Sequence, residues 1–185
     1  ESMPKAEEAA RRAVELEPDL ALGHSLLGTV HLFFHWDWNV AEREFRRAIE
    51  LDPNLADGHV GYAALLTTLG RFDEALRELK LAQSLDPMSP SAHVDELWMW
   101  FGRRQYQQAI TESRRWLERA SRAAAAQQGP ELARLLQTFA LLVLQQGDAG
   151  TARDVLAKVL VLWRRAGDRT GEAIALNSLG VAYRA

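Results

Sequence analysis

Residues 62–87 read YAALLTTLGRFDEALRELKLAQSLDP, and residues 27–53 read LGTVHLFFHWDWNVAEREFRRAIELDP. The two stretches share one pattern of small, bulky and charged positions. The pattern recurs about every 34 residues, the interval that separates Ala41 from Ala75 and Ala75 from Ala109. A period of this length is typical of one supersecondary unit stacked on copies of itself. The sequence therefore predicts a repeat architecture.

Hydrophobic periodicity predicts that nearly every segment is helical. Between residues 41 and 51 the apolar positions include Ala41, Phe45 and Ala48, which is the spacing of an amphipathic helix. Pro53 follows, and proline disfavours helical geometry in the residue before it. We expect an all-α protein with about ten helices, over residues 4–17, 20–34, 38–51, 54–69, 72–85, 89–102, 106–127, 130–146, 149–167 and 169–184.

Glycine, serine and proline mark the turns between these helices. Gly70 is expected to end a helix in the left-handed conformation, and Ser89 with Pro90 is expected to begin one. Glycines at 147 and 167 indicate later turns, and Gly129-Pro130 is the strongest break in the chain.

In these positions the chain resembles the tetratricopeptide repeat (TPR) family, whose unit of 34 residues is a pair of antiparallel helices. The pattern positions of the first complete unit are filled by His24, Leu27, Gly28, His31, Ala41, Phe45, Ala48 and Pro53. Those of the next unit are filled by His59, Tyr62, Ala63, Leu66, Ala75, Leu79, Ala82 and Pro87. The resemblance implies a right-handed superhelical solenoid. Within the family, the chain is similar to TPR arrays attached to bacterial signalling proteins, namely winged-helix activators, cyclases and kinases.

The resemblance covers residues 1–185 as a single solenoid. It divides them into the second helix of a partial repeat (4–18), repeats at 20–53, 54–87, 89–127 and 130–167, and the first helix of a truncated repeat (169–185). The 20–53 repeat carries one extra residue, which we expect in the turn at His35-Trp36-Asp37-Trp38. The 89–127 repeat has an elongated second helix and places Glu96 where the family has leucine or tyrosine.

Composition excludes several functional classes. The 185 residues are 48% hydrophobic and 25% charged with a net charge of -3, and no basic stripe indicates nucleic-acid binding. No apolar run approaches the length of a membrane span. Cysteine is absent, which excludes disulfides and thiolate chemistry and fits a reducing compartment. We expect a cytoplasmic protein that contacts neither nucleic acid nor membrane.

No catalytic motif is present. The sequence lacks a phosphate-cradling glycine loop, a nucleophile elbow and a positioned acid–base pair, so we expect neither an enzyme nor a cofactor. His31 and His35 have the spacing of two zinc ligands on one helical face, but no third ligand is evident and no metal is expected. His24, His59 and His93 fill the position of a bulky aromatic, so we expect them to pack.

Two apolar sets are candidates for binding. Trp36 and Trp38 lie beside Phe33 and Phe34, and we expect this cluster to pack a lengthened turn, a stacking site for a ligand being the alternative. In the TPR family the first helix of each pair lines the concave surface. The residues expected there are Leu22, Leu26, Thr29, Phe33, Val60, Ala64, Val94, Trp98, Phe101 and Leu141. The alternative is that most of them meet neighbouring helices.

These observations predict a non-catalytic scaffold that binds a peptide or protein segment on its concave face. Family members that bind chaperone tails do so with a clamp of lysine, asparagine and arginine. The corresponding positions here hold Ser25, Thr29, Gly61, Ser91 and Asp95, so that partner class is not expected. Two alternatives stay open: self-association through the unpaired terminal helices, and a sensor or regulatory role in a larger bacterial signalling protein.

Overall fold

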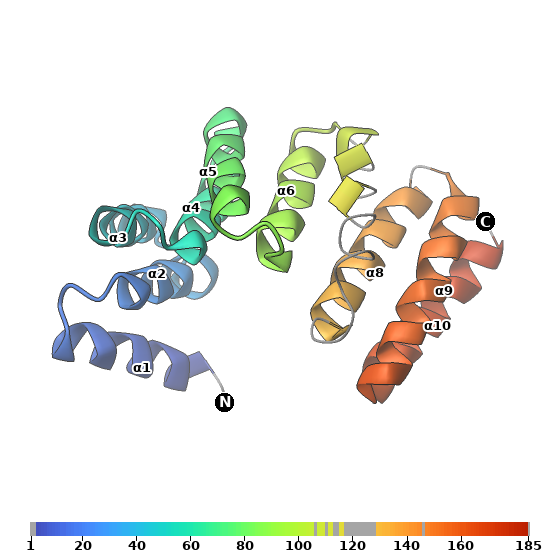
Figure 1. Cartoon of the computed structure of the whole chain (residues 1–185), viewed down its shortest axis with the longest axis horizontal. Coiled ribbons are helices and arrows are strands. Elements are labelled where there is room, and N and C mark those ends of the chain that lie inside the picture. Colours follow the sequence, from blue (N-terminus) through green and yellow to red (C-terminus); the bar gives the residue numbers. More distant parts are fainter. Residues whose placement is uncertain are drawn as a thin grey trace. The chain divides into compact units, whose positions relative to one another are not determined.

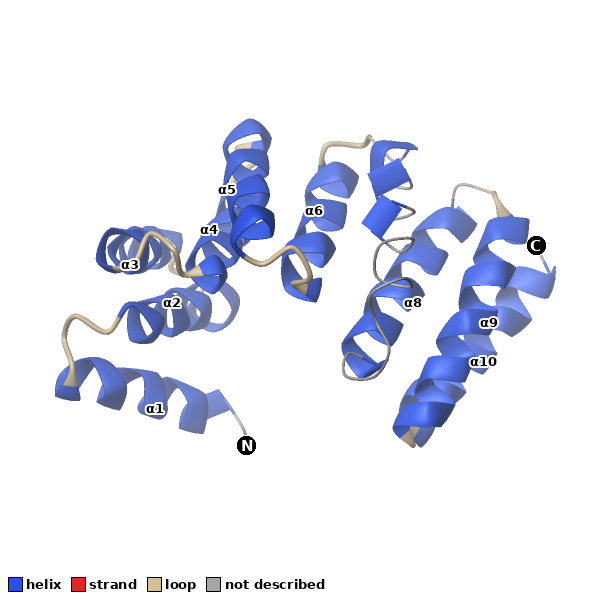
Figure 2. Ribbon diagram, viewed as in Figure 1, coloured by secondary structure: helices blue, strands red, loops and turns tan. Residues whose placement is uncertain are grey.

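Every regular element is a helix in the computed structural model, which describes residues 3–105, 107–109, 111–112, 115–116, 129–145 and 147–184 (Figures 1 and 2). No strand occurs in these ranges, so the all-α prediction is confirmed. The chain divides into two units, Glu1–Arg103 and Arg104–Ala185. The single solenoid over residues 1–185 stays a prediction.

The helices of the first unit begin and end within about two residues of their predicted bounds. They are α1 (Met3–Leu16), α2 (Ala21–Val30) with the π-helix η1 (His31–His35), α3 (Trp38–Leu51), α4 (Ala56–Thr68), α5 (Phe72–Leu85) and α6 (Pro90–Gly102). Each packs on elements near to it in sequence: α2 on α1, α3 and α4, and α4 on α3, α5 and α6. The first helices α2, α4 and α6 therefore form one row, as in a stacked repeat.

The second unit contains α8 (Gly129–Gln145), α9 (Ala149–Ala166) and α10 (Arg169–Arg184), with α9 packed on both others. The helix predicted over 106–127 lies mostly outside the described residues, but those described within it are helical. Trp163 of α9 joins the three helices. Its indole N–H donates to Gln137 Oε1 at 3.1 Å, and its ring lies on the backbone of Gly171.

Capping residues explain where the helices begin and end. Asp37 accepts the Val40 N–H at 3.1 Å to begin α3, and Ser89 with Pro90 begins α6. Gly70 has φ 74°, a left-handed conformation that glycine adopts without strain, and it separates α4 from α5. The predicted turn at Gly70 is therefore confirmed.

The extra residue of the 20–53 repeat is absorbed within the first helix, in the π-helical turn η1. The Trp36 N–H donates to the His31 carbonyl, five residues back, and Trp36 itself is left-handed with φ 55°. A π-turn accommodates one inserted residue without ending the helix. The extra residue was expected in the turn at His35-Trp36-Asp37-Trp38, and the π-turn overlaps that turn but begins earlier, at His31.

Small residues allow the helices of the first unit to pack closely. Ala41, Ala48, Ala75 and Ala82 are all fully buried, as the family pattern implies. Phe45 of α3 is also fully buried, between two glycines. A Cβ atom at Gly28 would lie 2.8 Å from Phe45 Cδ1, and one at Gly61 would overlap the same ring. These glycines are therefore required by packing.

Candidate functional site: the first-helix surface

The exposed sides of α2, η1, α4 and α6 form one surface, here called the first-helix surface. His24, His59 and His93 occupy the same position of successive repeats, which fixes the register of the three helices. In this register one repeat position is filled by Leu26 on α2, Gly61 on α4 and Asp95 on α6. Another is filled by Thr29, Ala64 and Trp98 on the same three helices. Each of these six residues is at least partly accessible to solvent. Because α4 packs between α2 and α6, these positions lie in rows across the unit.

The predicted site residues fall into three groups. Leu22, Leu26, Phe33 and Trp98 are exposed, each by 43–52%. Thr29, Ala64, Val94 and Phe101 are half-buried beside them. Val60 and Leu141 stand apart: Val60 is 7% exposed and packs with Ala82 and Ala92, and Leu141 lies on α8 of the second unit.

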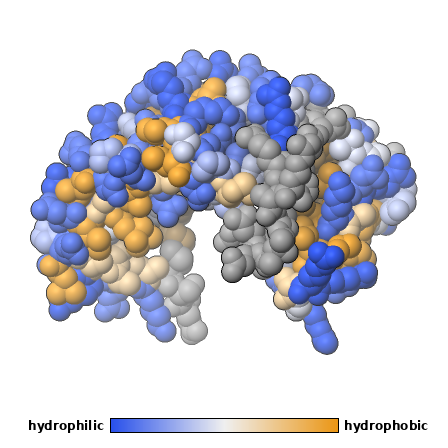
Figure 3. Space-filling view, in the orientation of Figure 1, coloured by the Kyte–Doolittle hydropathy of each residue, from blue (hydrophilic) through white to orange (hydrophobic). Residues whose placement is uncertain are grey.

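Aromatic and aliphatic side chains give this surface its apolar character. Trp98 and Phe101 stack edge to face, with ring centroids 5.9 Å apart. On α2 and η1, Leu22, Leu26 and Phe33 supply the other apolar positions. Figure 3 shows apolar atoms gathered over α2 and the elements beside it. A side chain as large as Trp98 left 45% exposed is a typical anchor for a partner.

Two carboxylates lie among these apolar residues, and neither was selected from the sequence as a binding residue. Asp57 is exposed in the first turn of α4, and its backbone carbonyl accepts the Ser25 hydroxyl at 3.5 Å. Asp95 of α6 is partly buried, and burial raises its pKa to about 7. The repeat register could have indicated both carboxylates from the sequence, because it aligns Asp57 with Leu22 and Asp95 with Leu26.

Glu96, the residue after Asp95, lies on a different side of α6 and is buried. It accepts hydrogen bonds from Lys80 Nζ at 2.8 Å, Gln83 Nε2 at 2.6 Å and the Trp100 indole N–H at 3.3 Å. Burial raises the pKa of Glu96, but the bonds from Lys80 and Gln83 outweigh it and hold the pKa below its usual value. The departure from the family pattern at this position is therefore compensated by Lys80 and Gln83 of α5.

The repeated histidines join helices and turns. His59 contacts Glu78 Oε2 through Nδ1 at 2.7 Å and the Pro53 carbonyl through Nε2 at 2.9 Å. His24 makes the same two contacts, with Glu44 at 2.7 Å and the Pro18 carbonyl at 2.9 Å. Since a carboxylate and a carbonyl only accept, the His59 ring must donate from both nitrogens to satisfy both. The packing prediction for His59 omitted this charge-assisted role.

His59 is expected to make stability depend on pH. Its hydrogen bond to Glu78 outweighs the opposing effect of burial and raises its pKa above 6.5. The contribution is therefore complete below pH 6.5 and is lost as pH rises through the folded-state pKa. His59→Gln should lower the free energy of unfolding by about 1.5 kcal/mol at acidic pH, the size of a hydrogen bond to a charged group. Urea unfolding measured from acidic to alkaline pH checks this: a difference from wild type that grows with pH would contradict it.

The aromatic cluster at η1 does not pack as predicted. Phe33, Phe34, Trp36 and Trp38 are all exposed, by 41–69%. The nearby rings of His31 and His35 have centroids 5.1 Å apart, and His35 Nε2 contacts Glu7 Oε2 at 3.1 Å. No group of three metal-ligating side chains suited to an ion occurs within the described ranges.

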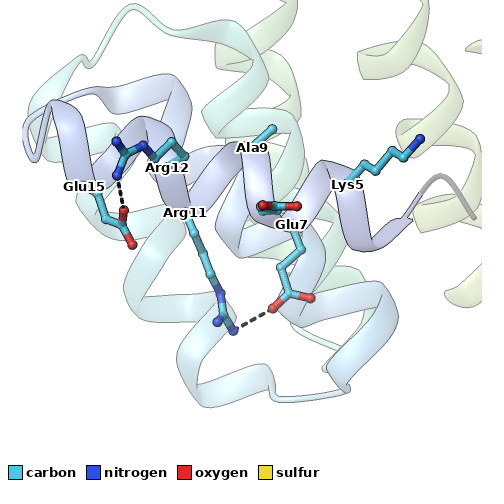
Figure 4. A pocket seen from close by; sticks show the side chains of 7 residues that line it. Lys5, Glu7, Ala9, Arg11, Arg12 and Glu15 are labelled. Atoms are coloured by element: carbon cyan, nitrogen blue, oxygen red, sulfur yellow. Dashed lines mark hydrogen bonds and ion pairs between the residues drawn. The ribbon is translucent and has the colours of Figure 1, made fainter.

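A hollow along α1 offers no comparable site. Its described lining residues all belong to that one helix: Lys5, Glu7, Glu8, Ala9, Arg11, Arg12 and Glu15 (Figure 4). Arg11 pairs with Glu7 at 2.6 Å and Arg12 pairs with Glu15 at 3.0 Å, so much of the charge is neutralised within the helix. Exposed pairs of this kind are typical of a solvated helix face.

Comparisons with known proteins identify the fold. No protein-family model matches the sequence, and no curated protein matches it. Among solved structures, the chain is similar to TTC0263, a thermophilic TPR protein in Thermus thermophilus, with a TM-score of 0.71 at 16% identity over 92% of this chain and 87% of that one. It is similar to BtubC from P. vanneervenii, with a TM-score of 0.70 at 20% identity over 99% and 81% of the two chains.

A third similar structure is YrrB, described as a TPR protein with an unusual peptide-binding site. Its TM-score is 0.56 at 15% identity, over 94% of this chain and 90% of that one. At these identities the likeness concerns the fold. The chain therefore has a TPR-like helical-repeat fold, as its sequence predicted. None of the described helices has the length and apolar character needed to cross a membrane.

Proposed function

We propose that the chain is a non-catalytic scaffold that binds a peptide or protein segment on the first-helix surface. The observation that carries the proposal is the exposure of Leu22, Leu26, Phe33 and Trp98 on one row of packed helices. Apolar side chains gathered on a rigid face, with an aromatic among them, are the usual composition of a protein-binding surface. The TPR-like fold supports the proposal, and YrrB is described as having a peptide-binding site.

Affinity capture with a matched pair of variants tests this function. Leu26→Ala with Trp98→Ala removes two exposed side chains from the first-helix surface, and partners retained by wild type should be lost or weakened at least tenfold. Leu16→Ala with Leu81→Ala is the control, since it removes two exposed leucines from the second helices α1 and α5. Equal loss in both double variants, or in the control alone, would contradict the proposal.

Self-association is the second candidate, and one observation favours it. The last helix, α10, exposes Ile174, Leu176, Val181 and Tyr183, by 41–70%. The exposed face of α1 carries mainly charged residues, including Lys5, Glu8 and Arg12. The exposed apolar side chains of α10 therefore support self-association through α10. The charged face of α1 gives less support to a pairing of α10 with α1. For this reason we rank the first-helix surface above the terminal helices.

A further inference from the structure

We infer that the first-helix surface selects a cationic amphipathic segment, with apolar side chains placed against Leu26 and Trp98 and lysine or arginine placed against Asp57 and Asp95. This inference rests on the proposed function and specifies the partner of the same surface. Three observations carry it: how charge is distributed between first and second helices, which carboxylates lack a partner, and how the acidic and apolar positions alternate across the row.

The only basic residues of the three first helices are histidines, and His24, His35 and His59 contact Glu44, Glu7 and Glu78. α2 with η1, α4 and α6 contain no lysine or arginine, whereas α3 and α5 carry Arg43, Arg46, Arg47, Arg77 and Lys80. The acidic residues of the first helices are Asp57, Asp95 and Glu96, and Glu96 is buried against Lys80. The charge that the first-helix surface presents is therefore negative.

Most carboxylates elsewhere in the first unit already have partners. Glu42 pairs with Arg71 at 2.9 Å, Glu78 with His59 at 2.7 Å and Asp73 with Arg103 at 2.6 Å. Others, such as Asp37, cap a helix. Among the described residues, none donates a hydrogen bond or ion pair to the carboxylate of Asp57 or Asp95. These two groups are therefore available to an incoming cation.

A nearby cation should stabilise Asp95 more than it stabilises Asp57. Burial acts alone in raising its pKa to about 7, which indicates that no positive charge lies close to it. A carboxylate partly removed from water without compensation gains when a cation arrives beside it. Asp57 is exposed and contributes mainly long-range attraction, which salt weakens.

The register of the helices places acidic and apolar positions next to one another. Leu26 on α2 and Asp95 on α6 flank Gly61, and Thr29 and Trp98 flank Ala64. The small side chain of Ala64 leaves room between Thr29 and Trp98, whereas the Phe45 ring of α3 fills the space beside Gly61. Neighbouring helix axes are about 9 Å apart, so a segment crossing all three spans roughly 20 Å, the length of about 14 helical residues.

Three synthetic helical peptides of about 14 residues test the inference by fluorescence anisotropy with the full chain. They share one pattern of leucines and carry lysine, glutamine or glutamate at every polar position. The lysine peptide should bind about tenfold more tightly than the glutamine peptide, and the glutamate peptide should bind most weakly. Asp95→Asn should weaken binding of the lysine peptide about fivefold and leave binding of the glutamine peptide unchanged. Glu50→Gln, on the second helix α3, should change the binding of neither peptide.

The possible outcomes separate this inference from the proposed function. If the three peptides bind alike and Leu26→Ala with Trp98→Ala weakens all of them, the surface binds peptides without charge selection and the inference is overturned. If none binds, the inference and the proposed function both fail for peptides of this class. If Glu50→Gln weakens the lysine peptide as much as Asp95→Asn does, the attraction comes from net charge and the inference is again overturned.

Discussion

Phe45→Ala is expected to lower the free energy of unfolding of the first unit by about 4 kcal/mol. Phe45 is fully buried, and its ring fills the space that Gly28 and Gly61 leave between α2, α3 and α4. Truncation removes the apolar contacts and leaves a cavity between the three helices. Glycines on both sides offer no side chain that can move into it, so the cavity has little means of collapsing.

Urea unfolding followed by circular dichroism measures this effect. Phe34→Ala is the matched control, because Phe34 is 47% exposed on η1 and its truncation should cost no more than about 0.5 kcal/mol. If Phe45→Ala lowers the free energy of unfolding by less than about 1 kcal/mol, or if both variants lower it equally, the Phe45 ring does not hold the two repeats together.

Lys80→Met is expected to lower the free energy of unfolding by about 3 kcal/mol, because it leaves the buried carboxylate of Glu96 without its cation. The Glu96 side chain is 4% exposed, and Lys80 Nζ lies 2.8 Å from its Oε1. Gln83 and Trp100 still donate in the variant, but both are neutral. Glu96 should then take up a proton at a higher pH than in wild type, because the hydrogen bond and positive charge of Lys80 no longer lower its pKa.

The double variant Lys80→Met with Glu96→Leu makes this prediction specific. Replacing both partners of a buried ion pair with apolar residues is often neutral or stabilising, so most of the lost stability should return. Lys158→Met, on an exposed position of α9, is the control for loss of one positive charge and should be nearly neutral. A double variant no more stable than Lys80→Met alone would contradict the account of this pair.

Local signals in the sequence were sufficient to predict the helices. The proline after Asp52 and the glycine at 70 set helix ends that the structure reproduces. Small residues such as Ala48 and Ala82 were predicted from the family pattern and are fully buried. These features depend on backbone conformation and on spacing along one helix, both of which a single sequence displays.

Features that depend on contacts across helices were harder to predict. The sequence located an extra residue near Trp36, but it did not indicate that a π-turn absorbs it. Val60 has the spacing of a surface residue, yet α5 and α6 cover it. The bond between His59 and Glu78 joins residues 19 apart, and its only trace in the sequence is that Glu44 lies one repeat before Glu78.

The sequence suggested the apolar residues of the candidate site but not its carboxylates. Leu26 and Trp98 were proposed because the first helix of each pair lines the concave surface in the TPR family, and both are exposed in the structure. The sequence placed Asp95 at a clamp position of the family without assigning it a role, and its partial burial emerges only when α6 is packed into the unit. Within the part of the chain that the structure describes, its lack of a partner is likewise a property of the folded chain, because it depends on which side chains the packing brings near.

The central claim is that the first-helix surface is where a partner binds, and a nuclear magnetic resonance titration tests it most directly. The six tryptophans give separate indole N–H signals, and the lysine peptide should shift that of Trp98 together with the backbone signals of Leu26 and Ala64. Trp163, buried in the second unit, should not move. Shifts confined to α3, α5 or α10, with Trp98 unchanged at saturation, would contradict the claim.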